Sequence, residues 1–294
     1  VGSEMCIRDT FSVANGEGKL NGVYGSQNNT AENGHGEVTL TNVPHKTQVP
    51  FTATPKYGWE VEGWTASAGT LSGGGTDTTA TLKVTDNATV TVKFKKITTV
   101  NGGDGAWKLL KKVVEIADPN STITIDGKIE ASSGNSGQIE IDKTLTIKGK
   151  TVAGNILDAN GLSRIFKVEN GATLFLENLT LKGGKADEAE DADKCGGAIY
   201  AKDANDIKII NCIITGNKAT TNGGGIYVEG GTTNITNCIF TGNTAKNGGG
   251  IYTKKEEGTP PTVTISGGII GGTEAADANE ATGTGTDGGG GIYI

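Results

Sequence analysis

Apolar and polar residues alternate along most of the chain, and this pattern predicts short β-strands rather than helices. In the first hundred residues the alternation marks segments such as Gln48–Thr54, Ala80–Val84 and Thr89–Phe94. Runs of Gly, Asn and Ser between these segments are typical of turns. The alternation continues after residue 120, for example in Thr122–Ile125 and Ala172–Leu176. The pattern therefore predicts an all-β protein.

One segment interrupts the alternation with helical spacing. Between residues 105 and 117 the apolar positions fall on one face of a helix: Trp107, Leu110, Val113, Val114 and Ala117. We expect Asp104 to cap this helix and Asp118-Pro119 to end it. A single amphipathic helix ahead of many strands predicts a lid over the apolar end of stacked coils. A helix lying on a membrane surface is the alternative, which its mixed polar face does not favour.

The strongest pattern in the chain is an internal repeat. The blocks Asn211–Ala219 and Asn237–Ala245 align closely with each other, with Asn178–Ala186 and, more weakly, with Gly267–Ala275. Each is followed by a glycine-rich block that ends in Ile-Tyr, at Ile199-Tyr200, Ile226-Tyr227, Ile251-Tyr252 and Ile292-Tyr293. The isoleucines are 27, 25 and 41 residues apart, so the inserted residues are expected in loops.

These repeats contain no helix long enough to connect parallel strands, so they predict a right-handed parallel β-helix over residues 121–294. We expect about seven coils, each about 4.8 Å from the next. Stacked coils bring equivalent residues into rows. The predicted rows are Ile199, Ile226, Ile251 and Ile292 facing inward, and Tyr200, Tyr227, Tyr252 and Tyr293 facing outward. Asn217 and Asn243, at matched turns, are expected to stack and to bond buried backbone groups.

A first resemblance covers most of residues 10–97. The segments Phe51–Pro55, Gly58-Trp59, Gly63-Trp64 and Thr89–Phe94 resemble the divergent internalin B-type repeat of bacterial surface proteins. The resemblance implies a small β-rich module that serves as a spacer or binding accessory on a cell surface. From their chemistry, Trp59 and Trp64 either fill the small core of this module or stack on a sugar ligand.

A second resemblance covers roughly residues 172–294. The Gly-Gly-Ala-Ile block at 196–199, paired with the Phe-x-x-Asn spacing of Phe240 and Asn243, resembles the chlamydial polymorphic outer-membrane protein repeat. It is also similar to β-helix surface proteins of other host-associated bacteria. One copy departs from the pattern, with Ile214 in place of the phenylalanine. The resemblance implies a secreted, autotransporter-like passenger at the outer membrane with a role in adhesion.

The two ends of the chain look unnatural. Val1–Asp9 resembles a translated sequencing adapter, which suggests a metagenomic fragment, and we expect these residues to lie outside the fold. The chain stops at Ile294 inside an apolar motif, so we expect the β-helix to be truncated. The expected organisation is a β module at 10–97, a linker and capping helix at 98–120, and a β-helix at 121–294.

Composition narrows the function classes. The formal net charge of −7 argues against nucleic acid as the main partner, because phosphate binding needs a basic face. No apolar run approaches 18 residues, so no transmembrane helix is expected in this fragment. Glycine contributes 48 of 294 residues, about twice the usual share, as the tight corners of a β-helix require.

The cysteines and acidic residues predict no metal site. Cys212 and Cys238 occupy equivalent repeat positions, where stacked coils would bring them close. Their parallel Cβ directions favour buried free thiols, with a disulfide as the alternative. The sequence has no C-x-x-C pair for zinc. The acidic insert Asp187–Asp193 lacks the calcium-loop pattern, so we expect a solvated loop, with weak calcium binding as the alternative. We expect no metal and no cofactor.

Candidate catalytic residues are few. Arg164 is the only arginine outside Val1–Asp9, and no acid or base follows it at repeat spacing. We therefore expect a non-catalytic surface or secreted bacterial protein, an adhesin-like passenger or stalk. Its β-helix would meet a protein or glycan on a host or neighbouring cell. A β-helix polysaccharide lyase or hydrolase, which would need paired carboxylates or a base beside calcium, is the alternative. A purely structural spacer is the other.

Overall fold

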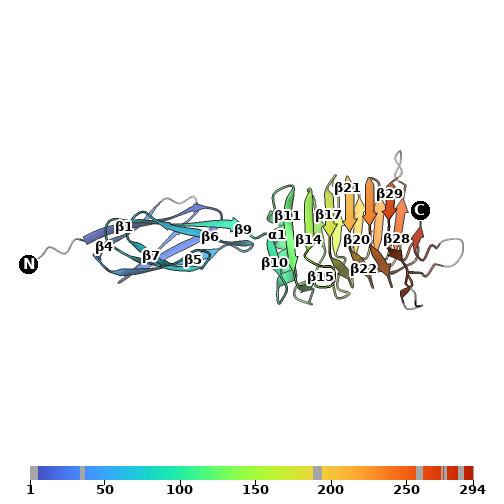
Figure 1. Ribbon diagram of the computed structural model, residues 1–294, viewed down its shortest axis with the longest axis horizontal. Helices are drawn as coiled ribbons and strands as arrows, with labels where there is room; N and C mark the ends of the chain where they lie inside the picture. The colour runs from blue at the N-terminus through green and yellow to red at the C-terminus, as the bar shows by residue number, and fades with distance from the viewer. Residues whose placement is uncertain are drawn as a thin grey trace, which may run out of the picture. The chain divides into compact units, whose positions relative to one another are not determined.

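The chain forms two compact units, Val1–Ile97 and Thr98–Ile294, which we call the N-terminal unit and the β-helix unit (Figure 1). The computed structural model describes residues 6–33, 37–187, 194–255, 261–272, 274, 277–283 and 288–293. Strands dominate both units, which confirms the predicted all-β class.

The described residues of the N-terminal unit form two sheets packed around a shared core. The strands are β1 (Cys6–Asn15), β2 (Gly18–Tyr24), β3 (Gln27–Glu32), β4 (Val38–Pro44), β5 (Gln48–Pro55), β6 (Trp59–Ala66), β7 (Thr70–Gly73), β8 (Thr79–Lys83) and β9 (Thr89–Lys96). They form the sheets β4-β1-β9-β6 and β3-β2-β5-β8-β7. Alternate residues of β5 and β9 are buried, and the Phe11 and Phe51 rings meet edge to face with centroids 5.6 Å apart. The alternation seen in the sequence therefore builds this core.

The start of the chain differs from the prediction. Residues Val1–Asp9 were expected to lie outside the fold, but β1 begins at Cys6 and pairs with β4. Ile7 is buried in the same core as Phe11. The physical reason is that Ile7, Asp9 and Phe11 continue the inward alternation of β1, so the strand extends through the segment that resembles an adapter. The origin of these residues stays a prediction.

Helix α1 (Ala106–Ile116) buries one face against the first strands of the β-helix unit. Its buried residues are Ala106, Trp107, Leu110, Val113 and Val114. Trp107 Nε1 also donates to the Gly137 carbonyl at 2.9 Å. The expected cap is wrong: Gly105 precedes the helix with φ of 74°, and no side chain bonds the helix start. A left-handed residue there turns Asp104 away from the capping position. Ala117 is not among the fully buried residues.

The described residues of the β-helix unit form four parallel sheets, and Figure 1 shows their strands following one another along the unit. The first is β10 (Thr99–Asn101), β11 (Ser121–Asp126), β14 (Leu145–Gly149), β17 (Thr173–Glu177), β21 (Asp206–Ile210), β25 (Thr232–Thr236) and β29 (Thr262–Ser266). The second is β12 (Lys128–Glu130), β15 (Ile156–Asp158), β18 (Thr180–Lys182), β22 (Ile213–Thr215), β26 (Ile239–Thr241) and β30 (Ile269–Ile270).

The third and fourth sheets complete the coils. The third is β13 (Ile139–Ile141), β16 (Phe166–Val168), β20 (Ile199–Lys202), β24 (Ile226–Glu229), β28 (Ile251–Lys254) and β32 (Ile292–Tyr293). The fourth is β19 (Lys185–Ala186), β23 (Lys218–Ala219), β27 (Thr244–Ala245) and β31 (Glu280–Ala281). A parallel β-helix is confirmed. Within the described residues six coils begin at β11, β14, β17, β21, β25 and β29, one fewer than predicted, because β10 leads into α1 instead of completing a coil.

The glycine-rich blocks allow neighbouring coils to approach closely. A Cβ added to Gly224 would lie 2.5 Å from the carbonyl oxygens of Gly249 and Thr244, a distance that no side chain tolerates. Gly223 has φ of 65°, which glycine adopts without strain. The repeated glycines therefore mark the corner at which consecutive backbones touch.

Candidate functional site

The isoleucine row lines the interior of the third sheet. Ile199 pairs with Ile226, Ile226 with Ile251, and Ile251 with Ile292. The first three are fully buried, and Ile292 is half-buried. The same register continues backward to Phe166 and Ile139, two residues that the repeat did not reveal. This row is structural and presents nothing to a ligand.

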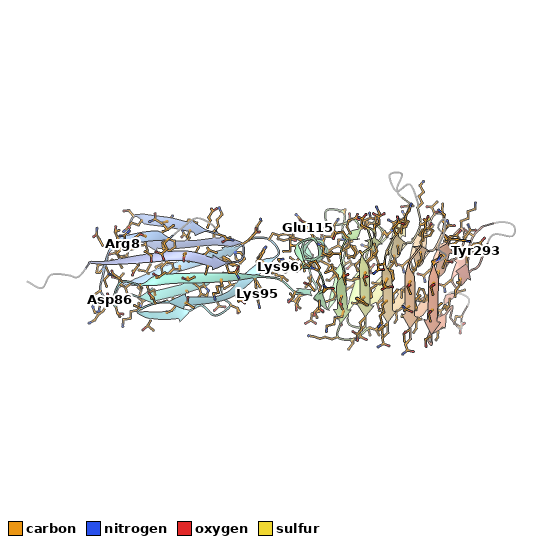
Figure 2. All side chains as sticks on the ribbon, turned by 90° about the horizontal axis from the view of Figure 1, so that it is seen from above. Arg8, Asp86, Lys95, Lys96, Glu115 and Tyr293 are labelled. Atoms are coloured by element: carbon orange, nitrogen blue, oxygen red, sulfur yellow. The ribbon has the colours of Figure 1, made fainter. Side chains whose placement is uncertain are left out.

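The tyrosine row lies on the other face of the same strands. The rings of Tyr200, Tyr227, Tyr252 and Tyr293 stack with centroids 5.2, 5.7 and 4.9 Å apart and planes within 7° of parallel. Figure 2 labels Tyr293 in the last strand of the row. The tyrosines lie on the outer face of their strands, as predicted, but Tyr200 and Tyr227 are covered and buried. They pack with Cys195 in a separate cluster, so the chain ahead of β20 covers them.

A carboxylate network anchors the middle of this row. Tyr227 donates its hydroxyl proton to Glu229 at 2.7 Å, and Lys254 donates to the other Glu229 oxygen at 2.9 Å. Burial and the bond to Glu229 raise the pKa of Tyr227. Burial acts to raise the pKa of Glu229, but the bonds from Tyr227 and Lys254 outweigh it and lower that pKa. Tyr227 therefore stays neutral and Glu229 stays ionised near neutral pH.

The asparagine row fills the matched turns after the second sheet. The Asn217 backbone N–H donates to Asn243 Oδ1 at 3.1 Å, and the Asn217 side chain donates to the same oxygen at 2.9 Å. Asn243 repeats both bonds to Asn279 Oδ1, at 3.1 and 2.8 Å. The Gly184 N–H bonds Asn217 Oδ1. Each amide therefore satisfies buried groups of two coils.

Asn279 was missed because the weak fourth repeat was aligned as Gly267–Ala275. The structure keeps Ile269 and Ile270 opposite Ile239 and Phe240, but it pairs Thr244 and Ala245 with Glu280 and Ala281. An insertion after the glycine pair therefore shifts the second half of that repeat. The signal that could have found it is the Asn-x-Ala pattern shared by residues 217–219, 243–245 and 279–281.

The cysteines at 195, 212 and 238 are free and buried. The Cys212 N–H lies 3.5 Å from Cys238 Sγ, as expected of neighbouring coils. Each of these two thiols donates to a carbonyl two residues earlier, at 3.2 Å in both cases. The interaction with Cys238 and burial raise the pKa of the Cys212 thiol, so it is not poised as a nucleophile.

The two tryptophans of the N-terminal unit are half-buried against its core. Trp64 Nε1 donates to the Asp77 carbonyl at 2.8 Å, and the Lys96 ammonium lies 6.0 Å from the Trp59 ring centre. These contacts support the core-filling alternative. Each ring also keeps some exposed surface.

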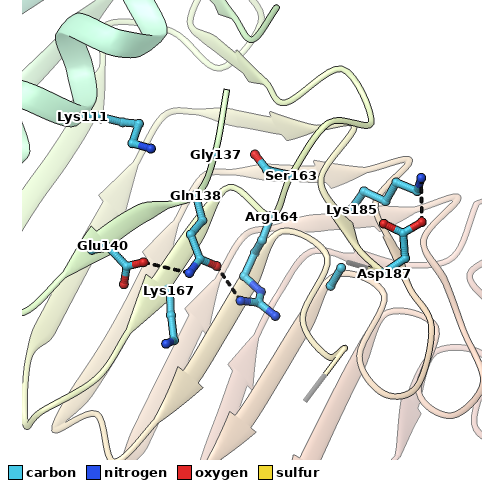
Figure 3. Close-up of a pocket in the computed structure, with 10 residues that line it drawn as sticks. Lys111, Gly137, Gln138, Glu140, Ser163, Arg164, Lys167, Lys185 and Asp187 are labelled. Atoms are coloured by element: carbon cyan, nitrogen blue, oxygen red, sulfur yellow. Dashed lines mark hydrogen bonds and ion pairs between the residues drawn. The ribbon is translucent and has the colours of Figure 1, made fainter. Parts of the chain in front are cut away.

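Arg164 lies at the end of the tyrosine row. Its guanidinium stacks on the Tyr200 ring, 4.8 Å from the ring centre. It donates to the carbonyls of Cys195 and Gly196 and, at 2.6 Å, to Gln138 Oε1. Gln138 in turn bonds Glu140 at 2.8 Å (Figure 3). Arg164 is 2% exposed, so its main role is to fix the chain around Cys195 over the tyrosines.

Charged residues gather near Arg164 in space, although they do not follow it at repeat spacing. A 410 Å³ hollow lies beside it, and its lining includes Lys111, Gln138, Glu140, Ser163, Lys167, Lys185 and Asp187. These residues come from α1, two coil corners and strands of different coils, so no spacing in the sequence connects them. Figure 3 shows these side chains around the pocket.

The described residues contain neither a metal-binding cluster nor a helix that could cross a membrane. Within the described residues, no three His, Cys, Asp or Glu side chains form a cluster that could hold a metal ion. Most of the acidic insert Asp187–Asp193 lies outside the described residues, so its calcium binding stays open. No helix in the described part of the chain is both long and apolar enough to cross a membrane.

Two families of repeats match the chain. The family model of the divergent InlB B-repeat domain matches residues 27–98. That of the Chlamydia polymorphic membrane protein repeat matches residues 211–229 and 237–254. Comparison with curated proteins and with solved structures gave no match. Both resemblances drawn from the sequence are thereby confirmed. The families are repeats of bacterial surface proteins, which points to a surface location.

Proposed function

We propose that this chain is the non-catalytic, exported part of a bacterial surface protein, and that its β-helix is an adhesive passenger or stalk. The observation that carries the proposal is the pairing, in one chain, of two repeat families of surface proteins on two compact units. The ligand would be a protein or glycan of a host or neighbouring cell.

The outer face of the second sheet supports the adhesive role. Ile213, Ile239 and Ile269 stand in register on consecutive coils, and Ile269 is 54% exposed. Their neighbours Thr215 and Thr241 also align on the outside. A surface that repeats every coil gives many weak contacts at a fixed spacing, which raises avidity without a deep pocket.

A cell-binding assay tests this role. The 294-residue chain, fluorescently labelled, is added to panels of epithelial cells, matrix proteins and bacteria. We expect saturable binding that falls in an Ile239→Lys/Ile269→Lys variant. A Lys208→Gln/Lys218→Gln variant, which changes exposed lysines elsewhere, is the matched control. Absence of saturable binding across the panel would leave the spacer as the better account.

The enzyme alternative has a separate test. The same chain is incubated with a panel of plant, bacterial and host polysaccharides. We expect no new reducing ends and no absorbance from unsaturated sugars, with or without added calcium. Release of either product that disappears in an Arg164→Lys variant would overturn the non-catalytic proposal.

A further inference from the structure

The hollow beside Arg164 is a preformed polar site on the outside of the β-helix unit. Its 410 Å³ is within the size range of small-molecule pockets. Helix α1 contributes Lys111, the corner before β13 contributes Gln138, and β16 and β19 contribute Lys167 and Lys185 (Figure 3). The hollow therefore joins four parts of the β-helix unit.

The residues that line the hollow carry a net positive charge, whereas the whole chain is negatively charged. Four basic residues face two acidic ones, Glu140 and Asp187, although the whole protein carries −7. The basic groups are held in place: Lys185 pairs with Asp187 at 2.6 Å, Lys167 with Glu169 at 3.0 Å, and Lys111 donates to the Ser136 carbonyl at 3.3 Å. Positioned ammonium groups favour an anionic ligand.

Ser163 gives an independent sign of a ligand. It lines the hollow, it is 8% exposed, and its hydroxyl has no hydrogen-bond partner among the described residues. A buried hydroxyl without a partner reduces stability, so such groups are rare unless they serve a purpose. Rotation about the Cα–Cβ bond would let this hydroxyl meet a polar group inside the hollow.

We propose that this hollow binds an acidic sugar, a unit that carries one carboxylate and several hydroxyls. The lysines would bind the carboxylate. Glu140, Asp187 and Ser163 would bond the hydroxyls, since carboxylates accept protons that sugar hydroxyls donate. The two acidic residues disfavour a dianionic phosphate, which they would repel. This site names a ligand class for the adhesive role and in that respect rests on the proposed function.

Titration calorimetry on the full chain tests the site with three probes. These are trigalacturonate, the neutral sugar galactotriose, and inorganic phosphate. We expect binding of trigalacturonate that is at least tenfold tighter than that of either other probe. A Lys111→Gln/Lys167→Gln variant should bind it about tenfold more weakly or worse, whereas the control variant Lys208→Gln/Lys218→Gln should bind as the parent does.

A Ser163→Ala variant separates a ligand role from a structural one. We expect its binding of trigalacturonate to weaken severalfold while its urea unfolding midpoint stays the same or rises, because an unpartnered hydroxyl has been removed. A lower midpoint with unchanged binding would overturn the role of Ser163.

Other outcomes would overturn the site itself. Equal binding of trigalacturonate and galactotriose, no binding of either, or unchanged binding by the double lysine variant would each do so. Phosphate binding as tight as that of trigalacturonate would make it a simple anion site and refute the sugar assignment. If the chain still bound cells in any of these cases, the proposed function would stand and only this site would fail.

Discussion

The asparagine row of the β-helix unit and the single buried carboxylate of Asp9 in the N-terminal unit differ in how their polar atoms are bonded. In the β-helix unit Asn217 and Asn243 each bond the next coil through the same two contacts. In the N-terminal unit Asp9 is fully buried, one oxygen accepts the Ala88 N–H at 3.2 Å, and the other has no partner among the described residues. In this row the repeat supplies the partner, because the equivalent asparagine lies one coil away. Asp9 belongs to no such row. Where the β-helix unit departs from the row, as at Ser163, a buried hydroxyl likewise has no partner among the described residues.

The largest expected effect is at the centre of the asparagine row. Asn243→Ala removes the partners of the Asn217 N–H and the Ile214 carbonyl, both buried. Because each group left unpaired costs about 1–3 kcal/mol, we expect about 3–5 kcal/mol less unfolding free energy for the β-helix unit. Urea unfolding followed by circular dichroism measures the change. Asn205→Ala, at an exposed loop position, is the matched control and should be nearly neutral.

A loss below about 1 kcal/mol in Asn243→Ala would show that the row is a consequence of stacking and not a cause of stability. If Asn205→Ala lowered the free energy of unfolding as much as Asn243→Ala does, the loss could not be assigned to the asparagine row. The comparison drawn from that row would then fail.

A smaller effect is expected in the tyrosine row. Tyr227→Phe keeps the stacked ring but removes the bond to Glu229, so we expect a loss of about 1–2 kcal/mol. The folded state lowers the pKa of Glu229, so this stabilisation is present above its ordinary pKa and is lost as the pH falls through the folded value. Unfolding midpoints at pH 7 and pH 3 should therefore differ less in Glu229→Gln than in the parent chain. An unchanged pH response in Glu229→Gln contradicts this account.

The smallest expected effect is at Asp9, where a substitution should raise the free energy of unfolding and not lower it. Burial raises the pKa of Asp9, and the bond from Ala88 only partly offsets this. The N-terminal unit should therefore lose stability as the pH rises from the ordinary value through the folded pKa. Asp9→Asn should stabilise this unit by about 1 kcal/mol at pH 7. Thermal unfolding monitored by tryptophan fluorescence of Trp59 and Trp64 tests it, and a lower midpoint would refute the cost assigned to Asp9.

The sequence predicted the architecture better than the surfaces. Alternation and the Ile-Tyr blocks were enough to place the strands of the later coils, because stacking fixes the register of every copy once one is known. The first coils, which lack the blocks, were recognisable only as strands. The shifted fourth repeat hid Asn279, since an insertion within a repeat breaks local alignment.

The sequence could not show which outward-facing side chains are covered, or which distant charged residues lie close together. Alternation correctly placed the tyrosines on the outer face of their strands, but it could not show that the chain around Cys195 folds back over Tyr200 and Tyr227. Likewise Lys111, Arg164 and Lys185 are far apart in the sequence and line one hollow only because α1, the corner before β16 and strand β19 converge. The search for a binding surface therefore moves from the tyrosines to the hollow beside Arg164 and the outer isoleucines.

Native-state hydrogen exchange tests most directly whether the asparagine row holds the β-helix together. The backbone N–H groups of Gly184, Asn217 and Asn243 donate to the row at 2.8, 3.1 and 3.1 Å. We predict that these three amides exchange only through global unfolding of the β-helix unit, and more slowly than the Ala88 amide beside Asp9. If they exchange as fast as amides of exposed loops, the row does not hold neighbouring coils together, and the contrast between the two units is wrong.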